Sequence, residues 1–267
     1  GIIDEALVVK RANKEPWALP AIARTPNEII EAMGSKYTFV SFDNIVKKLS
    51  SNSAIVGLPC QIRRYQNAYF KLGLFCGLNL SPRGIDYLLK KLGVKKEEIK
   101  ALDYRAPEGG LLVELKNGSK LTYKNYSWLA YFFSYSKCLY CKDNTNHYAD
   151  ISVGDRKPEW CNVIIRTQNG EEIFMRAEKE GYIKINSLTK EDFLTRTMSP
   201  LFQKELRGGY INTKLVRVRG RWIEFLPLNV LRFMGNLIYY HTCGKLSTQA
   251  LAKAFKKNLI YHYSKRH

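Results

Sequence analysis

The sequence predicts an α/β fold, with a mixed sheet core, flanking helices, an inserted β-hairpin and a helical, basic C-terminal extension. Three observations indicate this fold. Short apolar segments alternate with helix-like segments, Asn117-Gly118 separates two strand-like segments, and the last part of the chain is basic and amphipathic. Strands that alternate with helices are typical of sheets with parallel pairing, and Asn-Gly is a strong hairpin signal.

Local signals predict the individual elements. Residues 2–9 are apolar and predict a buried strand, which is followed by a proline-bounded loop through Trp17. Thr25 can cap a helix over 26–33, and Glu28 completes a capping box. The remaining segments predict helices at 42–49, 61–69, 82–92, 127–135, 171–180 and 189–196, and strands at 54–57, 71–75, 99–104, 111–115, 121–123, 149–155 and 163–167.

The chain is strongly basic, with a net charge of +19 over 267 residues. Residues 207–267 hold twelve Lys and Arg against one acid, Glu224. We therefore divide the chain into a domain of residues 1–206 and a basic helical extension of residues 207–267. Two amphipathic segments of the extension, 228–239 and 246–263, fit a membrane surface, a partner protein or the protein's own core.

Targeting signals are absent from the sequence. No apolar segment is long enough to span a bilayer, and no signal peptide precedes the first strand. We therefore expect a cytoplasmic protein, in which thiols stay reduced. Because the sequence begins at Gly1 without a methionine, we also expect that a native N-terminal segment is missing.

Cys138 and Cys141 form a C-x-x-C pair, which can bind one metal centre. A zinc ribbon has two such pairs, a thioredoxin-like pair lies at the start of a helix, and a cubane iron–sulfur cluster takes four thiolates from anywhere in the fold. Cys60 and Cys76 each follow an apolar strand, and they could complete a metal site or be small core residues. Zinc and iron–sulfur both stay open on spacing alone.

A second candidate site is the turn Gly34-Ser35-Lys36-Tyr37. Its hydroxyl, ammonium and phenol groups suit a phosphate or the edge of an isoalloxazine ring. A plain turn from helix to strand explains the same residues equally well. Because the sequence has neither a Walker loop nor a G-x-G-x-x-G motif, any nucleotide would be held in another way.

A series of motifs spreads in order over residues 1–185. The motifs are Gly1-Ile2-Ile3-Asp4, Thr25 to Glu28, Gly34-Ser35-Lys36-Tyr37, Val56-Gly57-Leu58-Pro59-Cys60-Gln61, Leu74-Phe75-Cys76, Tyr104-Arg105, Cys138-x-x-Cys141, Ala149 to Asp155 and Ile165-Arg166-Thr167. Together they resemble the beta subunit family of coenzyme F420 hydrogenases and dehydrogenases. The family usually carries a Gly-Gly-x-x-Thr stretch before the first strand, which this sequence lacks.

The resemblance implies an iron–sulfur flavoprotein, with FAD in an α/β domain, one [4Fe–4S] cluster, and coenzyme F420 docking over the flavin as substrate. It implies four cluster thiolates, from Cys60, Cys76, Cys138 and Cys141. The flavin contacts that we predict are Ser35, Lys36, Tyr37, Gly57, Gln61, Asp155 and Arg166. In this interpretation Cys161 and Cys243 are ordinary residues.

The sequence thus predicts an archaeal oxidoreductase subunit that exchanges hydride with coenzyme F420 and passes electrons to a partner subunit, in a complex that could lie on the inner face of the membrane. A ferredoxin-dependent reductase, with an acidic ferredoxin on the basic extension, is the alternative within the family. Outside it stand a subunit that has lost its flavin and a zinc-stabilised nucleic-acid-binding protein, although no base-reading module supports the latter.

Overall fold

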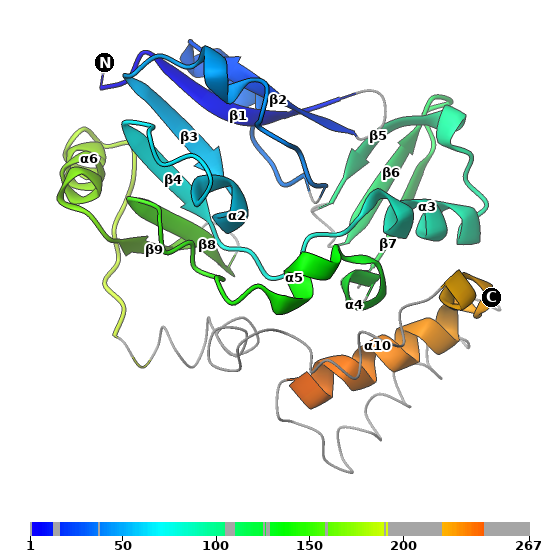
Figure 1. Ribbon diagram of the computed structural model, residues 1–267. Coiled ribbons are helices and arrows are strands. Elements are labelled where there is room, and N and C mark those ends of the chain that lie inside the picture. The colour runs from blue at the N-terminus through cyan, green and yellow to red at the C-terminus, as the bar shows by residue number, and fades with distance from the viewer. Residues whose placement is uncertain are drawn as a thin grey trace. The chain divides into compact units, whose positions relative to one another are not determined.

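The computed structural model describes most of the chain between residues 2 and 242 (Figure 1). The described residues are 2–12, 17–36, 38–104, 110–124, 126, 129–157, 160–189, 191 and 221–242.

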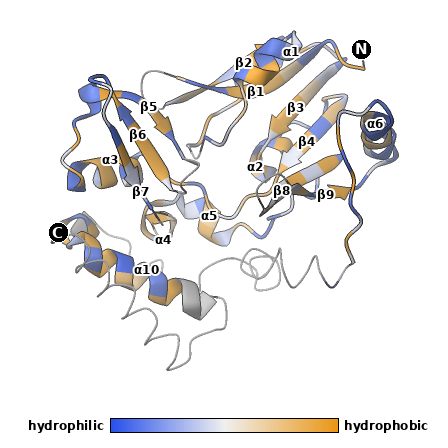
Figure 2. Ribbon diagram, turned by 180° about the vertical axis from the view of Figure 1, so that it is seen from behind, coloured by the Kyte–Doolittle hydropathy of each residue, from blue (hydrophilic) through white to orange (hydrophobic). Residues whose placement is uncertain are grey.

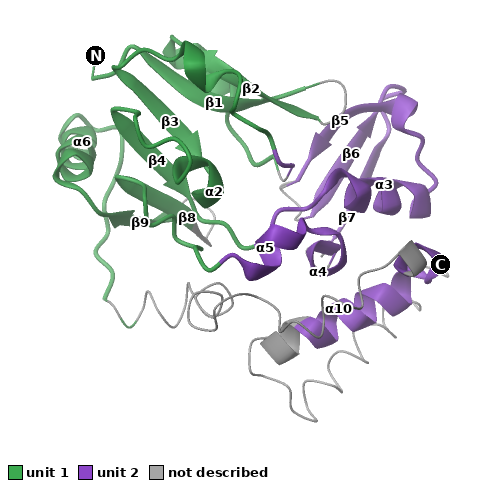
Figure 3. Cartoon of the chain, viewed as in Figure 1, with its two compact units in different colours: residues 1–36, 40–77, 142–206 green, residues 37–39, 78–141, 207–267 purple. Residues whose placement is uncertain are grey.

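The chain divides into two compact units (Figure 3). Unit 1 comprises residues 1–36, 40–77 and 142–206, and unit 2 comprises residues 37–39, 78–141 and 207–267. The predicted division into residues 1–206 and 207–267 stays a prediction, since only residues 221–242 of the extension are described.

Unit 1 is built on a six-stranded sheet with the order β2-β1-β3-β4-β8-β9. Strands β1, β3, β4 and β8 run parallel, while β2 and β9 pair antiparallel at the two edges. The strands are β1 Glu5–Arg11, β2 Ala18–Ala23, β3 Ser53–Gly57, β4 Phe70–Leu74, β8 Ile151–Lys157 and β9 Trp160–Ile165. This mixed sheet confirms the predicted fold class, and it brings the carboxyl ends of four strands to one edge.

Short helices connect these strands. They are α1 Pro26–Glu31, the 3₁₀ turn η1 Val46–Lys48, α2 Pro59–Ile62 and α6 Gln168–Lys179. The predicted capping box of α1 is confirmed, because the hydroxyl of Thr25 accepts from the backbone N–H of Glu28 at 3.3 Å while the Glu28 carboxylate accepts from the N–H of Thr25 at 3.1 Å. The cap satisfies donors that the helix itself leaves without acceptors.

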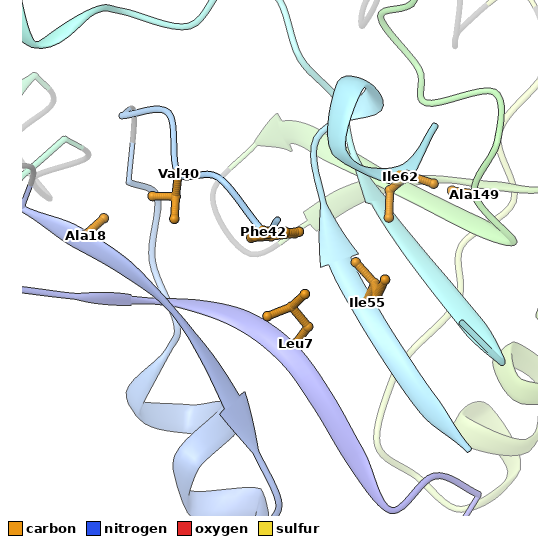
Figure 4. Close-up of a cluster of buried hydrophobic side chains, with 7 residues drawn as sticks. All are labelled: Leu7, Ala18, Val40, Phe42, Ile55, Ile62 and Ala149. Atoms are coloured by element: carbon orange, nitrogen blue, oxygen red, sulfur yellow. The ribbon is translucent and has the colours of Figure 1, made fainter. Parts of the chain in front are cut away.

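A cluster of buried apolar side chains packs on the strands of unit 1 (Figure 4). Its members are Leu7, Ala18, Val40, Phe42, Ile55, Ile62 and Ala149. Figure 2 shows hydrophobic residues along β3 and a largely hydrophilic α6. The burial of these strands agrees with their unbroken apolar sequences, which are typical of parallel strands covered on both faces.

Unit 2 contains a three-stranded antiparallel sheet with the order β5-β6-β7. The predicted hairpin is confirmed by the pairing of β6 with β7 and by the positive φ of 86° at Gly118. The predicted stripe of the helix at 82–92 is buried at Ile85, Leu88 and Leu89. The elements of unit 2 are α3 Pro82–Lys91, η2 Lys96–Glu98, β5 Ile99–Asp103, β6 Leu111–Leu115, β7 Lys120–Tyr123, α4 Leu129–Phe133, α5 Ser136–Tyr140, η5 Arg221–Phe225 and α10 Leu228–Thr242.

Two predicted helices are wrong. The segment 42–49 forms only η1, because its apolar side chains pack on the unit 1 core through turns that need no continuous helix. The segment 61–69 forms only the end of α2. There the side-chain amide of Gln66 donates to the carbonyl of Ile62, taking an acceptor that a longer helix would bond through its backbone.

The predicted loop through Trp17 is also wrong in part, since it contains strand β2. Pro20 is tolerated there because β2 lies at the edge of the sheet, where it pairs with β1 alone.

The C-terminal segment packs against unit 2 in its described part. Leu231 of α10 is fully buried, the Glu224 carboxylate pairs with Arg83, and the carbonyl of Leu226 accepts from the hydroxyl of Tyr87 at 3.3 Å. Arg232, predicted on a polar face, is buried instead. Among the described residues, no helix is long and apolar enough to cross a membrane. The predicted helices at 189–196 and 246–263 lie outside the described residues, apart from residues 189 and 191.

Candidate functional site

Cys60 and Cys76 follow the carboxyl ends of two neighbouring parallel strands. Cys60 lies in the first turn of α2, directly after β3, and Cys76 lies just beyond the end of β4. The two strands pair in register, with Gly57 opposite Gly73. Carboxyl ends of parallel strands are the usual place of ligand sites in open α/β sheets.

Neither of these two cysteines belongs to the hydrophobic core. Cys60 is exposed and Cys76 is half-buried, as are Cys138 and Cys141. The interpretation of Cys60 and Cys76 as small core residues is therefore wrong. No disulfide bond joins the cysteines of the described part of the chain.

The C-x-x-C pair lies in unit 2, on and just after the short helix α5. Cys138 is inside the helix and Cys141 is its C-terminal cap. Beside them, the ammonium of Lys137 lies 4.3 Å from the centroid of the Phe39 ring, which meets the Tyr135 ring edge to face at 5.6 Å. Burial raises the pKa of Tyr135, and the negative charge of a Cys138 thiolate raises it further.

The cysteines fit an iron–sulfur cluster in their chemistry. Four thiols outside the core can be deprotonated and can reach a metal, and thiolates are the ligands that such clusters take. Within the described residues, no group of three or more His, Cys, Asp and Glu side chains is placed to hold a metal ion. The structure thus places Cys60 and Cys76 in unit 1 and Cys138 and Cys141 in unit 2, and the four-cysteine set stays a prediction.

Residues 142–148 connect the C-x-x-C pair to β8, and we call them the 142–148 loop. The loop is held by its own side chains, since the Asp143 carboxylate accepts from the N–H groups of Asn146 at 2.7 Å and His147 at 3.2 Å. It also contacts the segment after β4, because the N–H of Cys76 donates to the carbonyl of Asn144 at 2.9 Å. The backbone of Cys76 is therefore fixed by the loop.

Asp155 and Arg166 lie at opposite edges of the sheet. The N–H of Arg166 bonds the carbonyl of Asp150, just before β8, while the backbone of Asp155 lies near the end of β8. Five residues of strand separate the two backbones by roughly 16 Å. The side chain of Asp155 lies outside the described residues, and the guanidinium of Arg166 donates to the Ser152 hydroxyl at 2.6 Å and to the Thr145 carbonyl at 3.1 Å.

Two other predicted flavin contacts have partners inside unit 1. The ammonium of Lys36 donates to the carbonyls of Ala32 and Met33 at the end of α1. The amide of Gln61 donates to the carbonyl of Val40 at 2.7 Å and accepts from the N–H of Leu58 at 2.7 Å. Both side chains therefore stabilise local backbone.

The last three predicted contacts are Ser35, Gly57 and Tyr37. Ser35 is half-buried, Gly57 ends β3 and Tyr37 lies outside the described residues. A Cβ atom at Gly57 would lie 3.3 Å from the side chain of Gln61, so a neighbour within the protein already explains this glycine. None of the flavin contacts is tested by these positions, and all stay predictions.

The sequence interpretation missed Asn146, the most connected side chain at the carboxyl edge of the sheet. Its amide nitrogen donates to the carbonyl of Gly57 at 2.9 Å and to that of Leu74 at 3.5 Å. The available signal was the pattern Asp143-Asn144-Thr145-Asn146 before a strand, since Asp and Asn favour side-chain turns and left-handed backbone.

Two family models match the chain, and both describe the beta subunit of "Coenzyme F420 hydrogenase/dehydrogenase". The model of its N-terminal part matches residues 1–47, and the model of its C-terminal part matches residues 50–191. The second match alone covers more than half of the chain, and the two together agree with the motifs read from the sequence.

Curated relatives carry related names. The coenzyme F420 hydrogenase subunit beta of Methanococcus voltae is 26% identical over 191 residues, which are 64% of this chain and 67% of the relative. The coenzyme F420-dependent sulfite reductase of Methanocaldococcus jannaschii is 27% identical over 246 residues, which are 81% of this chain and 38% of that enzyme. The chain therefore spans about two thirds of the first relative and well under half of the second.

The fold also matches a solved structure. A chain in the F420-reducing [NiFe] hydrogenase complex from Methanosarcina barkeri superposes with a TM-score of 0.62 at 22% identity, over 83% of this chain and 81% of the other. At this identity the match shows a shared fold.

Proposed function

This chain belongs to the beta subunit family of coenzyme F420 hydrogenases and dehydrogenases, and from that premise we propose that it is an oxidoreductase subunit that exchanges hydride with coenzyme F420. In this proposal, the electrons pass through FAD and one [4Fe–4S] cluster to a partner subunit. The observation that supports the proposal best is the position of the cysteines, four of which lie outside the core, two of them at the carboxyl edge of a parallel sheet.

The cofactors would supply chemistry that side chains cannot. A bound flavin takes a hydride as an electron pair, and a neighbouring cluster accepts electrons one at a time. The residues of this chain would bind and orient these groups. Cys60, Cys76, Cys138 and Cys141 would supply the cluster thiolates, and Ser35, Lys36, Tyr37, Gly57, Gln61, Asp155 and Arg166 stay the proposed flavin contacts.

The loops around Cys60 and Cys76 are suited to orienting a cluster because their backbone groups are already bonded. Gln61 fixes the turn that contains Cys60 through the N–H of Leu58, and the 142–148 loop fixes the N–H of Cys76. A rigid set of ligands lowers the reorganisation needed when the electron count of a cluster changes.

The partners that we propose are the other subunits of a redox complex. Relatives of this chain are named as beta subunits of hydrogenases and formate dehydrogenases. The basic residues of 207–267 would contact an acidic protein of the complex, an acidic ferredoxin or an anionic membrane surface.

The proposal is tested by an anaerobic titration of the purified chain with reduced coenzyme F420. Bleaching of flavin and cluster absorbance at one equivalent of hydride per FAD would support it. A chain that holds flavin and iron but does not respond to reduced F420, while ferredoxin reduces it, would instead favour the ferredoxin-dependent reductase.

A further inference from the structure

Three backbone segments that are distant in sequence meet at Asn146. Its Nδ2 donates to the carbonyl of Gly57 at 2.9 Å and to that of Leu74 at 3.5 Å, while its own carbonyl accepts from the hydroxyl of Ser152 at 3.2 Å. Cys60 lies three residues after Gly57, and Cys76 lies two residues after Leu74. One side-chain amide thus joins the strand ends from which both cysteines leave the sheet.

Asparagine suits this position for two physical reasons. Asn146 has a φ of 64°, in the left-handed region that Asn and Gly adopt more readily than other residues. The residue is fully buried, with 0% exposure, so its donor is best used on carbonyls that would otherwise lack one. Glycine would keep the backbone conformation but lose the donor, and aspartate would replace the donor by an acceptor.

The surrounding residues leave room for this side chain and hold its loop from the other side. A Cβ atom at Gly73 would lie 2.6 Å from Cγ and Nδ2 of Asn146, so the amide needs a glycine beneath it on β4. Arg166 binds the carbonyl of Thr145 at 3.1 Å and the hydroxyl of Ser152 at 2.6 Å. The loop cannot move away from β3 and β4 without breaking these contacts.

We propose that Asn146 is a positioning residue that fixes the spacing of the Cys60 and Cys76 thiolates for their shared metal centre. The inference rests on the proposed function, because it assumes that both cysteines bind one centre. The amide acts through the backbone of β3 and β4, and it contacts neither sulfur. Ser152 supports it by holding the carbonyl of Asn146.

The test is an anaerobic titration of the full-length apo chain with Co²⁺, whose thiolate charge-transfer band reports coordination by cysteine. The Asn146→Asp variant keeps the size and the left-handed backbone but removes the donor. We expect its Co²⁺ affinity to fall about 10- to 100-fold, the range for residues that orient metal ligands. We also expect a weaker charge-transfer band per bound ion, since fewer thiolates reach each ion.

Asn169→Ala is the matched control. The amide of Asn169 also donates to a carbonyl next to β4, that of Tyr69 at 3.2 Å, but at the edge of the sheet opposite Cys76. We expect this variant to bind Co²⁺ as the wild type does. Thermal unfolding of both variants separates a loss of stability from a loss of thiolate geometry. Should Asn146→Asp fail to fold, Ser152→Ala carries the same test with a smaller expected loss.

The outcomes are distinct. Wild-type affinity and an unchanged band in the Asn146 variant would overturn the inference, as would an equal loss in the Asn169 control. A reduced number of bound ions with an unchanged band per ion would also overturn it, because that result indicates a merely destabilised fold. A wild-type chain that binds Co²⁺ without a thiolate band would overturn the proposed function itself.

Discussion

The two cysteine pairs of this chain are presented by different kinds of structure. Cys138 and Cys141 lie on and just after one short helix, so local backbone geometry sets their spacing. Cys60 and Cys76 lie after two separate strands, and the spacing of their backbones depends on sheet pairing and on contacts with the 142–148 loop. The first pair is local in sequence, and the second is assembled by tertiary structure.

The difference teaches where substitutions away from the sulfur atoms should act. A local pair is expected to tolerate changes elsewhere in the fold, since its geometry follows from a single turn of helix. An assembled pair is expected to respond to any change that shifts one strand end relative to the other. Substitutions in the two units can therefore break this distinction or make it quantitative.

The largest effect is expected from the cysteines themselves, where the distinction should vanish. Cys60→Ser and Cys138→Ser should each reduce cluster content from about four irons per chain to a small fraction, because a [4Fe–4S] cluster takes four thiolates. Iron and sulfide analysis after anaerobic reconstitution measures this loss. Cys161→Ser is the control, because Cys161 is exposed on the edge strand β9. Loss of the cluster in Cys138→Ser alone would remove Cys60 from the site.

The next effect compares two buried glycines, one in each unit. Gly73→Ala would put its Cβ 2.6 Å from Asn146 in unit 1, and Gly84→Ala would put its Cβ 2.7 Å from Phe133 in unit 2. Overpacking of this kind costs about 1–3 kcal/mol of the free energy of unfolding. Thermal unfolding should show a similar loss for both variants.

Metal binding should separate these two glycine variants. Only Gly73→Ala is expected to weaken Co²⁺ binding beyond what its loss of stability explains, because only that substitution displaces the amide between β3 and β4. Equal losses of Co²⁺ affinity in the two variants would show that the pairs do not differ in their dependence on tertiary contacts.

A pH dependence should affect unit 2 specifically. Burial raises the pKa of Tyr87 to about 12, and its neutral hydroxyl donates to the carbonyl of Leu226. Because the unfolded phenol ionises near pH 10, the stabilisation is complete below pH 10 and is lost as the pH rises from 10 to 12. Burial also raises the pKa of Tyr104, which adds a slope of the same sign.

The Tyr87→Phe variant should flatten part of this slope and cost about 0.5–1.5 kcal/mol at neutral pH. Chemical unfolding at several pH values, followed by the fluorescence of the chain, measures both quantities. A slope that is unchanged in Tyr87→Phe would assign the alkaline transition to other groups.

The smallest effect concerns the charge beside the C-x-x-C pair. Lys137 is exposed and lies over the Phe39 ring at 4.3 Å, next in sequence to Cys138. A nearby cation favours the more negative, reduced state of a cluster, so Lys137→Met should lower its midpoint potential. Exposure to solvent limits the shift to about a few tens of millivolts. A potentiometric titration followed by electron paramagnetic resonance measures the shift, and a rise in potential would contradict this electrostatic effect.

Much of the fold could be predicted because its signals are local. The capping box at Thr25, the hairpin at Gly118 and the apolar stripe of α3 each lie within a few residues, and the structure contains all three. The C-x-x-C pair was visible for the same reason, and the motif order identified the family.

The errors have tertiary causes. The segment 61–69 has a helical pattern, but the Gln66 side chain takes the carbonyl of Ile62 and the helix ends. Asn146 could not be recognised from sequence, since its importance lies in carbonyls about 70 and 90 residues away. The uses of Lys36 and Gln61 as backbone caps likewise depend on partners that only the folded chain supplies.

The central claim is that Cys60, Cys76, Cys138 and Cys141 hold one [4Fe–4S] cluster. Mössbauer spectroscopy of the full-length protein, reconstituted anaerobically with ⁵⁷Fe and sulfide, tests it most directly. We expect that nearly all the iron gives the signal of a single cubane cluster, and that this signal disappears when any of the four cysteines is replaced by serine. Tightly bound zinc, with no sulfide and no cubane signal in the reconstituted protein, would contradict it.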